Sequence, residues 1–210
     1  MHKVCWYSES GTSLLAVLMI VPVVAILGGA VVWLSSAEAI FSARHRESVE
    51  ARFALAAALE RAVADLRELP DWSPVLGEVV GSGFVESAEP RLDDGTTIDL
   101  NRLDARLQQR SDASSRWGAD SPAWVRFAWG RLDTLVPPGG GPPLPLYLVV
   151  WVADDGADGD GNPLVDSNAV VQVRAEVFGP RGRRRIASVM LARIAQGPAG
   201  VRRVSWSDQG

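Results

Sequence analysis

The chain has almost none of the side chains that most enzymes use for acid–base or covalent chemistry. Lys3 is its only lysine, Cys5 its only cysteine, and His2 and His45 its only histidines. Everything after residue 45 therefore lacks imidazole, thiol and amine groups, the usual general bases, nucleophiles and soft metal ligands. A mechanism based on carboxylates alone needs two acids at a defined separation, and the spacing of the acids suggests none. We expect a protein that is not an enzyme and that has no disulfide after residue 5.

The sequence also lacks a large excess of positive or negative charge. The formal net charge is −4, so the chain as a whole does not attract nucleic acid or an anionic surface. Two short basic clusters, residues 181–185 and Arg202-Arg203, read as a solvated turn and a terminal tail. We expect no nucleic-acid partner.

What the sequence does contain is a long apolar run near its start. Residues 12–37 carry no charge. The core of this run, Leu14–Leu34, would form a helix of about 31 Å at roughly 1.5 Å per residue, close to the hydrocarbon thickness of a bilayer. A secretory signal has a shorter apolar region, although Ala37-Glu38-Ala39 has the form of a signal peptidase site. A single-pass anchor followed by one outer domain and a signal cleaved after Ala39 both stay open.

A charged, alanine-rich segment follows without Gly or Pro up to Pro70. Residues 38–68 have the periodicity of an amphipathic helix, and Pro70 ends the pattern. The two segments predict one helix over residues 12–68. The expected apolar stripe of its second half consists of Val49, Phe53, Ala56, Leu59, Val63 and Leu66.

Residues 69–198 predict an α+β head domain, with residues 199–210 as a C-terminal tail. The patterns favour a short strand pair over residues 77–87, a D-G hairpin at residues 92–100, a short helix at 101–110 and a loop at 111–121. Residues 124–135 are β-prone, and the Pro/Gly-rich residues 136–145 form a loop. Residues 146–153, 169–178 and 185–194 read as three strands of an antiparallel meander, one face of which packs on the helix stripe.

An acidic loop separates the first two of these strands. Asp158, Asp160 and Asn162 follow one another at every second position, with Asp154 before them and Asp166 after them. Oxygen ligands at this spacing suit Ca²⁺. The loop is no EF-hand, because its sixth position is Pro163 and its twelfth is Ala169. A calcium site and an ordinary solvated turn rich in Asp, Gly and Asn are both open.

The arrangement of a short leader, an apolar helix, an amphipathic half and a sheet resembles type IV pilin-like proteins. The segment GTSLLAVLMIVPVVAILG is most similar to PilX-type minor pilins and K-type minor pseudopilins, and the run from Tyr147 to Ile194 looks like the end of PilX-type proteins. The resemblance implies a leader of residues 1–11, cut after Gly11 by a prepilin peptidase, and a mature chain that begins at Thr12. Residues 12–37 would then be a membrane and fibre-core helix.

Two positions depart from the pattern of major pilins, which have an aromatic residue and a glutamate at mature positions one and five. This chain has Thr12 and Ala16 there. In the family the glutamate pairs with the amine of a neighbouring subunit, so its absence fits a subunit at the tip.

The resemblance therefore implies a minor subunit of a pilus or secretion pseudopilus. Such a subunit starts in the bacterial inner membrane and primes assembly by binding other pilins, with a tip adhesin as a further partner. The rival hypothesis is a membrane-anchored extracytoplasmic binding or scaffold domain without a fibre role.

Overall fold

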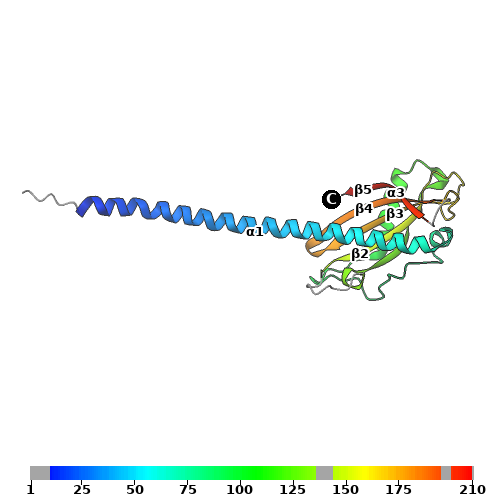
Figure 1. Cartoon of the computed structure of the whole chain (residues 1–210), viewed down its shortest axis with the longest axis horizontal. Helices are drawn as coiled ribbons and strands as arrows, with labels where there is room; N and C mark the ends of the chain where they lie inside the picture. The colour runs from blue at the N-terminus through cyan, green and yellow to red at the C-terminus, as the bar shows by residue number, and fades with distance from the viewer. Residues whose placement is uncertain (1–9, 136–143, 195–199, 210) are drawn as a thin grey trace, which may run out of the picture. The chain divides into compact units, whose positions relative to one another are not determined.

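The computed structural model describes residues 10–135, 144–194 and 200–209. A long helix, α1 (Ser10–Glu68), is followed by a five-stranded antiparallel sheet with short helices around it (Figure 1). The predicted α+β class is confirmed. The chain divides into a unit that ends at Ser48 and a unit Val49–Gly210, and α1 contributes to both.

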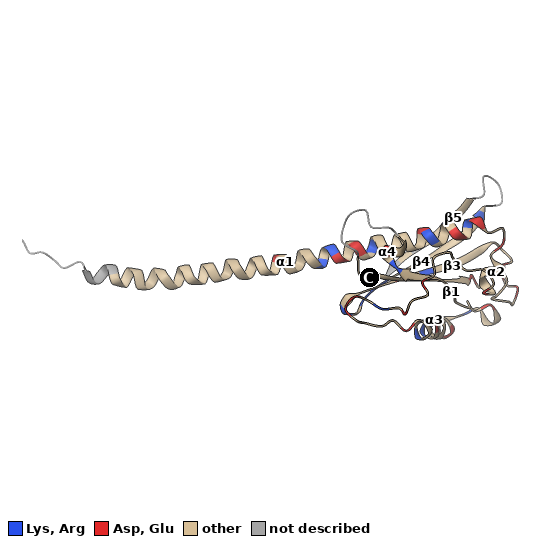
Figure 2. Cartoon of the chain, turned by 90° about the horizontal axis from the view of Figure 1, so that it is seen from below, with Lys and Arg blue, Asp and Glu red and all other residues tan. Residues whose placement is uncertain are grey.

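The first half of α1 is apolar and carries no charge until Glu38 (Figure 2). Every large apolar side chain from Leu14 to Leu34 is more than half exposed. Among the described residues, α1 is the only helix long and apolar enough to cross a membrane. The helix includes Gly11 and Thr12 and runs through Pro22. Its observed start, Ser10, lies close to the predicted one.

The second half of α1 packs against one face of the sheet. Leu59, Val63 and Leu66 of the predicted stripe are buried, but Phe53 is 73% exposed and Ala56 only half-buried. The buried face is completed by Ala54, Leu55, Ala58 and Ala62. The predicted stripe was therefore wrong at Phe53, whereas its first residue, Val49, is half-buried. Apolar residues recur at gaps of three and four on two neighbouring faces of this alanine-rich helix. The sequence does not distinguish the two faces, and packing against the sheet determines which one is buried.

The end of α1 is fixed by Trp72. The Nε1–H of Trp72 donates to the carbonyl of Leu66 at 2.9 Å, and the Trp72 side chain is fully buried. This bond satisfies one of the carbonyl groups that a helix leaves unpaired at its C-terminus. The four-residue helix α2 (Ser73–Leu76) then follows.

The sheet is a meander in which every strand pairs with its sequence neighbour. Its strands are β1 (Val125–Arg131), β2 (Tyr147–Asp154), β3 (Val170–Gly179), β4 (Arg183–Ile194) and β5 (Gly200–Gln209), in the order β1-β2-β3-β4-β5. The three predicted strands are β2, β3 and β4, so the predicted meander is confirmed. The η2 turn (Pro180–Gly182) joins β3 to β4, and Arg181 has a positive φ there.

The two faces of the sheet are covered differently. On the α1 face, alternate residues of β2, β3 and β4 join α1 in one apolar core. On the second face, α3 (Leu100–Ser114) and the residues just before it cover Tyr147, Val149 and Trp151 of β2. β2 is consequently buried along its whole length, as its apolar sequence indicates. Asp99 caps the N-terminus of α3, because its carboxylate accepts from the backbone N–H of Arg102.

Several minor elements differ from expectation. Residues 77–87 form no strand pair. Instead Ser82–Glu86 runs along the edge of β1, with backbone bonds to Phe127 and Trp129. The predicted D-G turn is present, with a bridge between Arg91 and Thr97 and Gly95 at φ +85°. α3 extends to Ser114, so the expected loop at 111–121 is shorter and contains the single turn η1 (Gly118–Asp120).

The expected tail, residues 199–210, is a strand over Gly200–Gln209. Val201 is buried in the core beneath α1, and Arg203 forms an ion pair with Glu60 of that helix. These tertiary contacts order the segment. The β-prone residues 124–135 form β1 and the short helix α4 (Leu132–Leu135). Most of the predicted loop at 136–145 lies outside the described residues.

The two apolar residues Leu59 and Phe53 give a direct test of this packing. Leu59→Ala removes a fully buried side chain and is expected to lower the free energy of unfolding by about 2–5 kcal/mol. Phe53→Ala removes an exposed one and is expected to change it by less than about 0.5 kcal/mol. Thermal unfolding of the full chain in detergent, followed by tryptophan fluorescence, measures both. Equal effects would contradict the observed face of α1.

Candidate functional site

The candidate site is built on the loop between β2 and β3, where turn chemistry sets the backbone. Asp160 accepts from the N–H of Asn162 at 2.8 Å, and Asn162 in turn accepts from the N–H of Leu164 at 3.2 Å. Gly159 and Gly161 have positive φ values of 70° and 78°. These contacts are the side-chain turns that Asp and Asn favour. The side-chain oxygen of Asn162, a predicted calcium ligand, therefore already accepts a hydrogen bond from the backbone N–H of Leu164.

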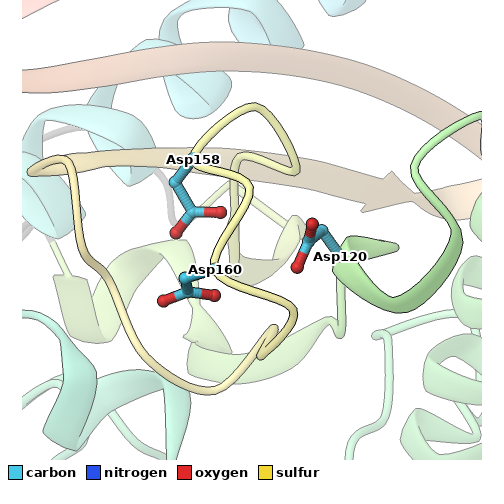
Figure 3. Close-up of side chains that lie close together, drawn as sticks. All are labelled: Asp120, Asp158 and Asp160. Atoms are coloured by element: carbon cyan, nitrogen blue, oxygen red, sulfur yellow. The ribbon is translucent and has the colours of Figure 1, made fainter.

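Three carboxylates meet at this loop. Asp158 and Asp160 lie beside Asp120, and one oxygen of each falls within 4.8 Å of the others. Asp120 comes from η1, a turn far away in the sequence, and Figure 3 shows it reaching toward the two loop aspartates. Two of the five predicted ligands are thus brought together, with a third carboxylate that the sequence analysis did not select.

Gly156 permits this approach. A Cβ at this position would lie 2.7 Å from the carbonyl oxygen of Asp120 and 2.7 Å from Cγ of Trp117. Only glycine lets the η1 turn press against the loop so closely. Nothing in the local sequence of Asp120 marks it as a site residue, since it stands in a polar segment without periodicity. Its role follows from the tertiary contact alone.

The oxygen atoms of this cluster are incompletely satisfied. Among the described residues, Oδ1 of Asp120 and Oδ1 of Asp158 are shielded from solvent and have no hydrogen-bond partner. The other oxygen of Asp158 accepts from the hydroxyl of Ser167 at 3.0 Å. A set of close carboxylate oxygens with open valences suits a hard cation such as Ca²⁺. The residues present therefore fit the predicted calcium site in their chemistry.

Asp154 is buried at the end of β2, and Asp166 is partly buried near the start of β3. Burial raises the pKa of Asp154 to about 7, and the neighbouring carboxylates of Asp158 and Asp166 add to the shift, while a bond from the N–H of Asp155 opposes it. Burial also raises the pKa of Asp166, which accepts from the N–H of Val170. The backbone N–H of Asp166 donates to Ser73 Oγ at 3.2 Å. This contact ties the loop to α2.

Comparisons with known proteins add no relative. The chain matches no protein-family model, and neither curated proteins nor solved structures give a match. Its architecture, a long apolar helix whose second half packs on an antiparallel sheet, is compatible with a pilin-like fold.

The raised pKa of Asp154 predicts a pH dependence of stability. The native state keeps this proton to higher pH than the unfolded state, so the contribution to stability is complete below about pH 4, falls between about pH 4 and 7, and is absent at higher pH. Asp154→Asn cannot ionise. In the presence of a chelator, we expect the variant and the parent to unfold at similar temperatures near pH 4 and the variant to be the more stable near pH 8. A difference independent of pH would contradict the assignment.

The Asp120 contact predicts how calcium acts. If the cluster binds calcium, millimolar calcium raises the unfolding temperature of the full chain in detergent, and a concentration 100 times the Kd adds about 2.7 kcal/mol of stability. We expect Asp120→Asn and Asp158→Asn both to abolish most of this gain, with Glu89→Gln, an exposed acid outside the cluster, as the control. A response lost in Asp158→Asn but kept in Asp120→Asn would place the ion within the loop alone. If calcium does not change the unfolding temperature of the parent chain, the loop is an ordinary turn without a calcium site.

Proposed function

We propose that this chain is a minor, tip-type subunit of a type IV pilus or a type II secretion pseudopilus, which primes assembly by binding other subunits. The observation that carries the proposal is the division of one uninterrupted helix. Residues 14–34 of α1 expose apolar side chains all round, whereas Val49–Glu68 bury one face against an antiparallel sheet. A soluble protein would not leave so much apolar surface in water, because each Å² costs about 25 cal/mol.

The exposed apolar half of α1 requires an apolar environment. A bilayer provides one before assembly, and a bundle of similar helices in a fibre core provides another afterwards. In this proposal the chain sits in the bacterial inner membrane, a prepilin peptidase cuts it after Gly11, and the helix then moves into the fibre. The head, in the periplasm or outside the cell, docks on minor and major subunits and on a tip adhesin.

The first turn of the mature chain supports a tip position. Ala16 stands where major pilins have the glutamate that pairs with a neighbour's amine, and Thr12 stands in place of the aromatic residue. A subunit without that carboxylate lacks one contact to the next subunit, which suits a place at the end of the fibre. The chemistry of the subunit is binding, consistent with a head that has no histidine, cysteine or lysine.

Processing at the N-terminus separates this proposal from its rival. We expect mass spectrometry of the chain from its native host to show a first residue of Thr12 with a methylated amine. Gly11→Leu, which puts a large side chain beside the scissile bond, is expected to leave the leader uncut, and Gly29→Leu serves as a control for the same change deeper in the helix. A mature chain that begins at Met1 fits a plain anchored scaffold, and one cut after Ala39 fits an exported domain. Either result would overturn the pilin proposal.

A further inference from the structure

The second face of the sheet is only half covered. α3 and the hairpin before it pack over β1 and β2, and Phe178 near the end of β3 packs against the same cluster. The register carries this face onward, because Trp151 pairs with Arg174 of β3, Arg174 with Ser188 of β4, and Ser188 with Ser207 of β5. Paired residues point to the same side of a sheet. The face over β3–β5 thus continues beyond α3, and among the described residues only Phe178, near the end of β3, belongs to an apolar cluster on it.

A buried glutamate lies on this uncovered half. Glu176 is 1% exposed and stands between two arginines. Arg174 donates from Nε to one carboxylate oxygen at 3.0 Å, and Arg184 donates from Nε to the other at 2.7 Å. The side chains of Arg174 and Arg184 are 14% and 30% exposed, so part of this charged cluster reaches the surface of the sheet.

Two guanidinium groups on one carboxylate leave a net positive charge. Each guanidinium has five N–H donors and uses two of them on Glu176, so it retains donors for another acceptor. Arg202 of β5 adds a further positive charge, because it pairs with Ala192 on the same face and is exposed. Arg202 lies apart from Glu176, because Glu176 pairs with Ile186 and Arg202 pairs with Ala192, farther along β4. The face therefore has positive charge at two places, in a chain whose net charge is −4.

Half-buried apolar and small polar side chains lie between these charges. Ile186 and Met190 of β4 flank Ser188 on this face and are only partly buried. A planar guanidinium binds a carboxylate through two parallel N–H bonds, and the neighbouring apolar groups give contact area around it. The combination matches a protein surface with one or two acidic side chains among apolar ones.

From this charge complementarity we infer that the second face over β3–β5, which we call the arginine face, is a docking surface for an acidic segment of a partner protein. Its residues are Gln172, Arg174, Arg184, Ile186, Ser188, Met190 and Arg202. Lipid is a poorer occupant, because headgroup binding takes clusters of about four to eight basic residues without interspersed acids. A second copy that placed its own acidic loop here would make a head-to-tail contact, which either closes into a ring or grows into an open polymer. The inference does not depend on cleavage at Gly11, and it applies equally to a fibre subunit and to an anchored scaffold.

Site-specific photocrosslinking tests the arginine face in the full-length chain in its native host. A p-benzoylphenylalanine in place of Ser188, at the centre of the face, is expected to crosslink to another protein through a peptide that contains Asp or Glu. The same probe in place of Gln109, on the exposed side of α3, is the background control. Mass spectrometry of the crosslinked peptide identifies its sequence.

Charge reversal then tests the stated chemistry. Arg202→Glu leaves the Arg174–Glu176–Arg184 cluster intact and is expected to lower the crosslink yield at position 188 by roughly fivefold, the scale of one interfacial charge pair. Arg106→Glu, the same change on exposed α3, is expected to leave the yield unchanged. An acid-to-arginine change in the identified peptide is expected to restore the yield with Arg202→Glu.

Four results would overturn the inference. These are a yield at position 188 no higher than at position 109, a crosslink to a second copy of the chain or to lipid, a captured peptide without acids, and equal yields from Arg202→Glu and Arg106→Glu. An unaltered unfolding temperature of Arg202→Glu confirms that a lost crosslink reports docking and not a misfolded head.

Discussion

The contact between α1 and the sheet is the constraint on which the head depends. Leu55, Leu59 and Leu66 of the helix and alternate valines of β2 and β3 form one core. An isolated antiparallel meander has two faces open to water, and α1 closes one of them. The other face is closed only over β1 and β2, by α3. The uneven covering of the sheet leaves the arginine-lined half at its surface. A separate contact, from the N–H of Asp166 to Ser73 Oγ, ties the β2–β3 loop to α2.

Much of this fold could be predicted from the sequence, because its elements have strong local patterns. β2, β3 and β4 were each placed within one or two residues, since their apolar runs alternate or are continuous and end at Gly, Pro or Asp. The long helix was equally clear. β5 was not predicted, because Arg202-Arg203 resembles a solvated tail. Its order comes from the burial of Val201 and the ion pair of Arg203 with Glu60, which are tertiary contacts.

The same distinction applies to the candidate site and to the helix face. Asp158 and Asp160 were predicted because their spacing is local, whereas Asp120 joins them only through the close approach that Gly156 allows. The exposed position of Phe53 was missed because alanines supply much of the buried face, and alanine gives a weak periodic signal. The burial of Glu176 between two arginines was not predicted, because Arg184 belongs to the neighbouring strand.

The chain order of these elements has a consequence for biosynthesis. α1 is synthesised first, but the strands that bury its apolar face begin only with residue 125 and the central ones only at residue 147. During the interval the helix face has no sheet to cover it, and transiently exposed apolar surface is prone to aggregation. Each strand, once made, pairs with the one just before it, so the sheet needs no distant pairing to form. The slow step in the folding of the head is therefore expected to be the docking of the completed sheet on α1, which is synthesised well before the strands.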